Sequence, residues 1–138
     1  MISATIADRS ALRALDRLSR ARTRDLAEVV GAVHESQVRR RIADEKTAPD
    51  GSAWAPWAAD YEGGDSLLLR SGSLLDSIAF VVGDDDVAVG SPLIYAGAHE
   101  RGTDTIPARP FLGVSAANAD ELAEAVEGWL AAAAEGRR

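Results

Sequence analysis

Two histidines and a run of acidic residues are the side chains of this sequence best suited by type to catalysis or metal binding. His99 precedes Glu100, and Asp104 follows Glu100 by four residues, so these three side chains resemble the start of a metal site. No second histidine lies near them and the sequence has no cysteine, so the donors that zinc prefers are missing. We therefore interpret His99 as a structural or interface residue. His34, within a helical segment among polar neighbours, is interpreted as a solvated or interface residue.

The other candidates for chemistry also lack the required spacing. Asp84, Asp85 and Asp86 are consecutive, whereas a calcium loop uses alternate positions, so we predict a solvated hairpin turn there. No Gly-x-Ser-x-Gly element accompanies either histidine, and no glycine-rich phosphate-binding loop is present. The sequence thus predicts no catalytic residue, no metal site and no cofactor, and it disfavours an enzyme.

Length and charge place these side chains in a small acidic protein. The 138 residues suit a single domain, and 46% of them are apolar, which is enough for a hydrophobic core. The net charge is −7, because residues 1–46 hold ten Lys and Arg against seven Asp and Glu, while 47–138 hold five against fifteen. This asymmetry suggests one basic and one acidic surface and disfavours nucleic-acid binding along the whole chain. We expect a cytoplasmic origin and no membrane partner, since no signal peptide and no stretch of roughly 20 apolar residues is seen.

Helical periodicity dominates the first 46 residues. After a short strand expected at 1–6, an amphipathic helix begins behind a cap at Asp8, and a second helix, capped by Thr23, ends near Glu45. In one straight helix Arg22 would fall within the apolar face, so we predict a break there.

Arginines line the face of this region that lies opposite its leucines. The stripe could contact phosphates, or it could face solvent or an acidic protein. Interruption by Asp16 and Asp25, together with the acidity of the rest of the chain, favours the solvated or protein-facing interpretation. The stripe consists of Arg9, Arg13, Arg17, Arg20 and Arg24.

A long irregular loop is predicted at 47–73, with Gly63 and Gly64 at its tip. It carries Trp54 and Trp57, which could anchor a partner protein or pack onto their own domain. Because no Lys or Arg is interleaved with them, stacking on nucleic acid is poorly supported.

Short elements are predicted after the loop. A turn of helix leads into a β-hairpin of Ile78–Val82 and Val87–Val89, and Pro92 starts a helix that ends near Gly102. An extended arm at 103–117 is followed by a last helix, 118–138, capped by Asn118 with Glu121. The fold class is α+β, with the long N-terminal helical region and the C-terminal helix packed on a small, mainly antiparallel sheet. Its successive parts are 1–46, 47–73, 74–117 and 118–138.

Four segments between about residue 40 and residue 115 form an ordered series of motifs. They are PDGSAWAPW at 49–57, LRSGSLLDSI at 69–78, VGS at 89–91 with YAGAHERG at 95–102, and IPARPFLG at 106–113. In this order they resemble elements of the phage virion morphogenesis family, the Mu-like tail completion proteins, and the last segment is the most specific match. The chain departs from the family pattern at Trp57, where leucine is usual, and at 60–65, where a longer basic insert is common. These departures affect the contacts of the loop.

The last motif has the chemistry of a docking device. Pro107 and Pro110 fix the backbone and lack N–H donors, so they hold an extended arm. Arg109 between them is expected to be held ready for a bidentate contact with a carboxylate. Phe111 and Leu112 supply apolar anchors, either for the domain's own core or for a neighbour's groove.

The resemblance implies a structural virion protein, a tail completion or neck subunit that is assembled in the host cytoplasm and serves tail morphogenesis or head–tail joining. We expect a homo-oligomeric ring, of six subunits by the general symmetry of tails, that contacts tail-tube, terminator or head-completion proteins. Genomic DNA would only pass through its channel, which the acidic surface would line. The candidate interface residues are Trp54, Trp57, Tyr95, His99, Arg109, Phe111, Leu112, Arg13, Arg17 and Arg20.

Two other classes of function remain open at this stage. A nucleic-acid-binding regulator would use the arginine stripe and would retard DNA with steep salt dependence. A small hydrolase would use His99 with a nearby acid and would lose activity in His99→Ala.

Overall fold

One long helix, α1 (Arg9–Arg40), is the axis of the fold. The computed structural model describes residues 9–60, 66–69, 71–84 and 86–135, and for 9–21 it describes the backbone alone. A π-helical segment, η1 (Arg41–Glu45), continues α1 and ends at Lys46, whose φ is 59°. The predicted helix end near Glu45 is therefore confirmed.

The predicted break in the N-terminal helix is wrong, because α1 runs without interruption through residue 22. Arg22 is exposed, and Leu26, one turn further on, is only half-buried. The Arg22 side chain reaches solvent at this position, so it interrupts the apolar face without disturbing the helix. The strand expected at 1–6 and the cap expected at Asp8 lie outside the described residues.

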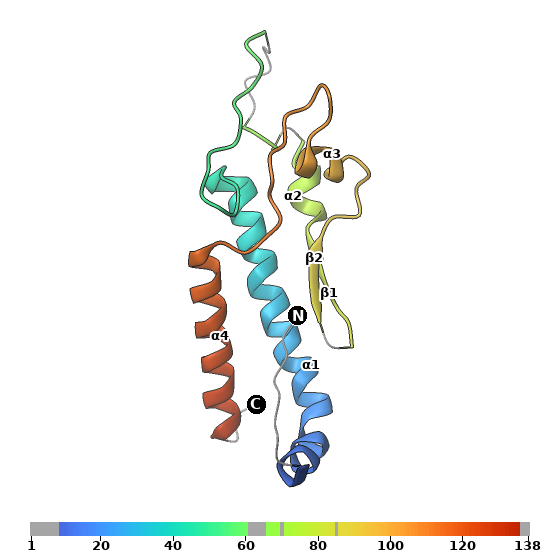
Figure 1. The fold of residues 1–138 in the computed structure, drawn as a ribbon, viewed down its shortest axis with the longest axis vertical. Helices are drawn as coiled ribbons and strands as arrows, with labels where there is room; N and C mark the ends of the chain where they lie inside the picture. Colours follow the sequence, from blue (N-terminus) through green and yellow to red (C-terminus); the bar gives the residue numbers. More distant parts are fainter. Residues whose placement is uncertain (1–8, 61–65, 70, 85, 136–138) are drawn as a thin grey trace.

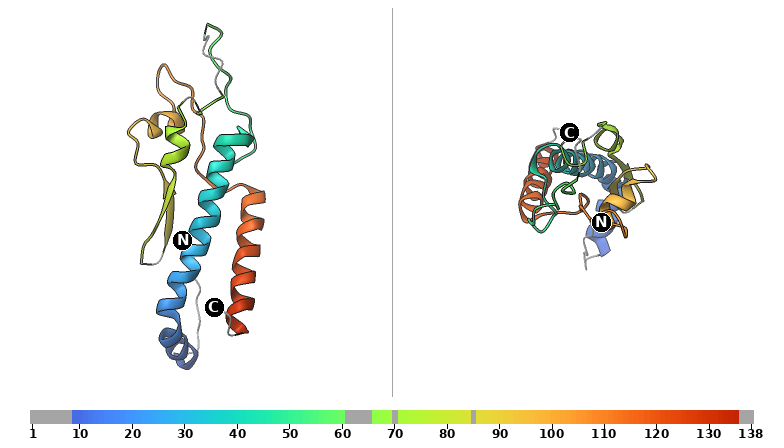
Figure 2. Two further views of the ribbon diagram at one scale, coloured as in Figure 1. Left: turned by 180° about the vertical axis from the view of Figure 1, so that it is seen from behind. Right: turned by 90° about the horizontal axis from the view of Figure 1, so that it is seen from above.

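The C-terminal helix and a β-hairpin lie on either side of α1 (Figures 1 and 2). The helix is α4 (Ala116–Ala134), and the hairpin consists of β1 (Ala79–Val82) and β2 (Val87–Gly90). The two strands pair antiparallel, with Ala79 opposite Gly90 and Val82 opposite Val87. The α+β class and the hairpin are thus confirmed, and α1 is the element that both α4 and the hairpin contact.

A glycine in the middle of α1 lets the hairpin approach the helix closely. Gly31 is buried under the ring of Phe80, and a Cβ atom at residue 31 would lie 2.7 Å from Phe80 Cγ. Glycine costs a helix interior about 1 kcal/mol relative to alanine, a loss that this close packing offsets. The hairpin is also held by the Arg39 guanidinium, which donates to the Ile78 carbonyl at 2.7 Å.

Two short helices connect the loop, the hairpin and the arm: α2 (Ser73–Ser77) and α3 (Ala96–Arg101). The prediction that Pro92 starts the second of these is wrong by four residues. Ser91 Oγ accepts a hydrogen bond from the Leu93 N–H at 3.1 Å, and Leu93 O accepts one from the Ala96 N–H at 3.1 Å. A turn closed by a side chain therefore precedes α3, which ends at Gly102 as predicted.

The start of α4 also differs from its prediction. Ser115 Oγ accepts from the Asn118 N–H at 3.0 Å, and Asn118 Oδ1 accepts from the Ser115 N–H at 3.2 Å, which makes a reciprocal capping box. The predicted pair of Asn118 with Glu121 lies three residues too late. Glu121 binds Arg40 of α1 instead, at 2.7 Å.

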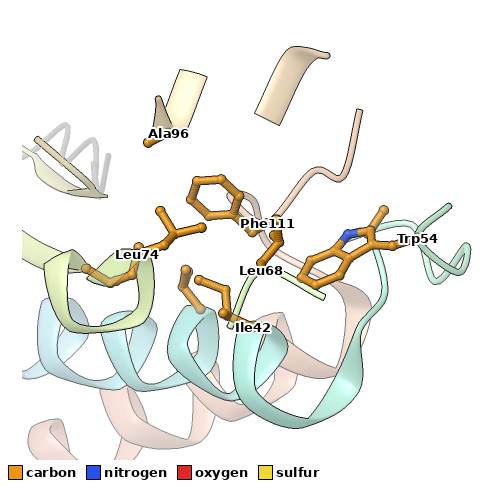
Figure 3. Packing of buried hydrophobic residues seen from close by; sticks show 9 residues of the cluster. Ile42, Trp54, Leu68, Leu74, Ala96 and Phe111 are labelled. Atoms are coloured by element: carbon orange, nitrogen blue, oxygen red, sulfur yellow. The ribbon is translucent and has the colours of Figure 1, made fainter. Parts of the chain in front are cut away.

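The hydrophobic core lies at the C-terminal end of α1, where the loop, α2, α3 and the arm meet (Figure 3). Further toward its N-terminus the apolar face of α1 is only half-buried, at positions such as Val29, Val30 and Val33. The core therefore holds the motif segments together at one end of the long helix. Its members are Val38, Ile42, Ala48, Trp54, Leu68, Leu74, Ile78, Ala96 and Phe111.

Candidate functional site

The arm at 103–115, here called the proline arm, is held along α3 by hydrogen bonds from its backbone. Glu100 Oε2 accepts from the N–H groups of both Phe111 and Leu112, at 2.8 and 3.1 Å. The Arg109 N–H donates to the His99 carbonyl at 2.7 Å. At Gly102, where φ is 78°, an added Cβ would lie 2.8 Å from Ala108 N, so only glycine fits this close return of the chain.

Within the chain Arg109 binds backbone carbonyls, and no carboxylate of the described residues contacts it. Its side chain is only 4% exposed, its Nε donates to Ala55 O at 2.8 Å, and its Nη2 donates to Pro56 O at 2.9 Å. The guanidinium carbon lies 5.3 Å from the centre of the Trp57 ring, within cation–π range. Burial lowers the pKa of Arg109 below its ordinary value. An irregular loop packed against an arm leaves carbonyl groups without strand or helix partners, and the planar guanidinium satisfies two of them at once.

The two loop tryptophans have different roles. Trp54 is 5% exposed, and its Nε1–H donates to Pro110 O at 2.7 Å, so it packs onto its own domain. Trp57 is half-buried and forms one wall of a pocket with Arg109. Of the two alternatives left open by the sequence, Trp54 takes the internal one.

The two apolar anchors of the proline arm also face inward to different degrees. Phe111 is completely buried, and Figure 3 shows its ring among Leu68, Leu74 and Ala96. Leu112 is half-buried and packs against the same core. Phe111 is therefore an anchor for this chain's own core, and no surface of it is left for a neighbour's groove.

Arg41 joins the long helix to the C-terminal part of the proline arm and to the start of α4, and it was not among the predicted site residues. Its side chain is 1% exposed, Nη1 donates to Phe111 O at 2.7 Å and to Gly113 O at 3.0 Å, and Nη2 donates to Asn118 Oδ1 at 2.5 Å. The buried Gln37 donates to Asn118 O at 3.1 Å in the same region. A signal was present, because positions 37 and 41 continue the helical spacing of the apolar face, so two polar side chains there needed buried partners.

A pocket of about 400 Å³ opens between the loop, α2 and α3 beside Arg109. Ser71 and Gly72 lie at its edge, and the Tyr95 and His99 rings meet edge to face within it, with their centres 5.8 Å apart. His99 Nδ1 is buried without a hydrogen-bond partner among the described residues. We call this site the Arg109 pocket; its principal walls are Trp57, Leu68, Leu74, Tyr95, His99 and Arg109.

The remaining predicted site residues lie away from this pocket or outside the described side chains. Arg13, Arg17 and Arg20 belong to the part of α1 for which only the backbone is described. His34 forms a hydrogen bond with Gln37, at 2.9 Å, and Asp84 and Asp86 are exposed on the hairpin turn. In the part of the chain that the structure describes, no three His, Asp or Glu side chains converge as a metal site would require.

Burial of His99 predicts a pH dependence of stability. Desolvation, followed by the nearby charge of Arg109, lowers its pKa in the folded protein below the ordinary 6.5. The unfolded chain therefore takes up this proton first, so stability is fully present above 6.5 and falls as the pH drops toward the lower folded value. Between about pH 8 and about pH 5, we expect the free energy of unfolding of His99→Gln, measured with urea, to fall less than that of wild type. Parallel stability curves for the two proteins would contradict this prediction.

The fold and the pocket define a protein that uses the polar residues of its motifs to bind its own backbone. The chain belongs to the phage virion morphogenesis family, whose model matches residues 6–131. The resemblance found in the sequence is thus confirmed. Membership in this family indicates a role in phage structure or assembly.

Curated relatives come from a Mu-like prophage and from phage Mu. The chain is 31% identical over 108 residues to the Mu-like prophage FluMu G protein 1 of Haemophilus influenzae, covering 72% of this chain and 73% of that protein. It is 31% identical over 110 residues to the putative capsid assembly protein G of Escherichia phage Mu, covering 70% of each chain. No solved structure matches it. Among the described residues, no helix has the length and hydropathy needed to cross a membrane.

Proposed function

We propose that the protein is a non-catalytic ring subunit at the head–tail junction of a phage, required for tail completion or head–tail joining. Its natural partners are further copies of itself, in a ring of six, and the adjoining tail-tube, terminator or head-completion proteins. Genomic DNA passes through the ring, and the excess of acidic residues in 47–138 would keep its phosphates from adhering to the channel wall.

The observation that carries this proposal is that side chains of the motifs bind other segments of the same chain. Trp54 and Arg109 join segments 49–57 and 106–113, and Glu100 joins segments 95–102 and 106–113. In these contacts the polar atoms bind backbone groups of the same chain. This arrangement suits a rigid building block better than an enzyme, which needs a nucleophile or general base free to meet a substrate.

Family membership supports the assembly role, and the name of the phage Mu relative, a putative capsid assembly protein, points the same way. The half-buried apolar face of α1 supports the ring, because such a face gains stability when a neighbouring subunit covers it.

Removal of the gene tests the proposal directly. We expect lysates of the deletion phage to contain heads and tails that are not joined, or tails of abnormal length, by electron microscopy. A plasmid copy of the gene should restore joined particles, and mass spectrometry should find the protein in them. Normal infectious particles from the deletion phage, or purified virions that lack the protein, would refute the proposal. Retardation of DNA with steep salt dependence would favour a nucleic-acid-binding regulator instead.

A further inference from the structure

The Arg109 pocket holds a buried positive charge that no carboxylate of the described residues neutralises. Arg109 is 4% exposed, and its contacts are two carbonyl oxygens and the face of Trp57. Carbonyl groups solvate a cation but do not balance its charge, and a buried cation strongly favours an anion nearby. Among the described residues, the pocket thus offers an electrostatic attraction for a carboxylate that none of them supplies.

The other residues that line the pocket restrict the kind of group that can carry this carboxylate into it. Leu68 and Leu74 are apolar and buried, and Tyr95, which also lines the pocket, is exposed at the surface. Its neighbour in sequence, Ile94, is 99% exposed. A volume of about 400 Å³ accommodates only a few side chains. The occupant must therefore be a narrow protrusion that carries a carboxylate and an apolar flank.

Several turns of the described residues expose an aspartate, among them Asp50 and Asp104, but the β1–β2 hairpin turn is the one beside a largely exposed apolar side chain. The turn of the β1–β2 hairpin exposes Asp84 and Asp86, and Val81 beside it is 69% exposed. The acidic residues of α4 are a poorer fit, because they lie on a helix about 10 Å wide that cannot enter a small pocket.

The hairpin turn cannot reach the pocket of its own molecule. Figure 1 shows the turn at the end of β1 and β2 that points away from α2 and α3. The strands have four residues each, which at about 3.4 Å per residue separates the turn from that region by roughly 14 Å. An occupant with this chemistry must come from a second molecule.

We propose that the Arg109 pocket receives the acidic hairpin turn of a second copy of the chain, with the carboxylate of Asp84 or Asp86 facing Arg109. Because the contact joins two different surfaces of the chain, successive copies associate head to tail. They close into a ring if the rotation between neighbouring copies allows it. The inference rests on the proposed ring for its supply of neighbouring copies, and it names the surfaces through which they meet.

Disulfide trapping tests this contact, because the natural sequence has no cysteine. Ser71→Cys places a thiol at the pocket edge, and Asp84→Cys places one on the turn while leaving Asp86 in place. After mild oxidation of a mixture, we expect the two variants to form a linked dimer with a yield about tenfold above that of Ser71→Cys with Asp120→Cys. Asp120 is the matched control because it is an exposed aspartate on α4.

The trapping is carried out both on concentrated purified protein and on whole particles that carry the paired variants. A preferential 71–84 link in either supports the proposal, and equal yields for the test and control pairs in both overturn it. A photo-crosslinker attached at Ser71→Cys in particles that captures a different virion protein also overturns it, since the occupant is then not a second copy.

A charge-competition variant gives an independent measurement without disturbing Arg109, whose hydrogen bonds stabilise the fold. Ser71→Glu places a carboxylate at the pocket edge, and we expect it to weaken self-association about tenfold in sedimentation velocity. Ser36→Glu is the control, because Ser36 is exposed on α1 and does not line the pocket. Equal association of the two variants contradicts the contact. If Ser71→Glu phage still assemble joined particles with the protein present, the pocket contact fails while the ring function stands.

Discussion

Replacement of Arg41 by methionine is expected to lower the free energy of unfolding by about 3–5 kcal/mol. Methionine keeps much of the side-chain volume but donates no hydrogen bond, so three acceptors lose the Arg41 donor, and of these Asn118 Oδ1 keeps the Ser115 N–H. These acceptors are Phe111 O, Gly113 O and Asn118 Oδ1, from the proline arm and the start of α4. Urea denaturation followed by circular dichroism measures the change.

Arg40 provides the matched control for this substitution. It is the preceding residue, but its partners, Glu45 and Glu121, lie on a solvent-exposed surface. Exposed ion pairs contribute about 0–1 kcal/mol, so Arg40→Met should change stability little. If Arg40→Met destabilises the protein as much as Arg41→Met does, the buried hydrogen bonds of Arg41 do not have the importance we assign to them.

Truncation of Phe111 to alanine is expected to cost about 3–5 kcal/mol, because its ring is wholly buried at the centre of the core. The loss combines the transfer of an aromatic ring to water with the cavity that remains. Phe111→Leu should retain most of the stability, with a loss below about 1.5 kcal/mol. Thermal unfolding of the two variants beside wild type separates these effects.

The same substitution distinguishes the two roles that the sequence left open for Phe111. An anchor in the chain's own core destabilises the isolated protein when it is truncated, whereas an anchor in a neighbour's groove weakens only assembly. Ile94→Ala serves as the control, since Ile94 is 99% exposed and should change stability by less than about 0.5 kcal/mol. An unfolding curve of Phe111→Ala that overlays wild type would assign Phe111 to a neighbour.

Stability of the proline arm matters for assembly because the arm shapes the Arg109 pocket. Arg41 fixes the arm at Phe111 and Gly113, and Glu100 fixes it at Phe111 and Leu112. Arg109 lies two residues before Phe111, and the loop carbonyls of Ala55 and Pro56 hold its side chain. If the hydrogen bonds of Arg41 are removed, we therefore expect the backbone of the arm to shift and the Arg109 pocket to change with it.

Local patterns in the sequence account for most of the elements and for the family. Helical periodicity predicted α4 and the helical N-terminal region to Glu45, and turn residues predicted the hairpin, because both signals depend on neighbours a few residues apart. The errors occurred where two local signals competed. Asn118 with Glu121 looked like a capping pair, yet Ser115 with Asn118 forms it, and Arg22 looked like a helix break, yet the exposed surface tolerates it.

The sequence by itself determined that this chain is an α+β member of a phage virion morphogenesis family without a recognisable catalytic pattern. Only the tertiary structure decided the partners of the functional side chains, such as Arg109 on the Ala55 and Pro56 carbonyls and Trp54 on Pro110. The physical reason is that these acceptors belong to irregular backbone more than fifty residues away in sequence. Which carbonyls are left without a partner is set by how the loop and the arm pack together, and no local spacing records that.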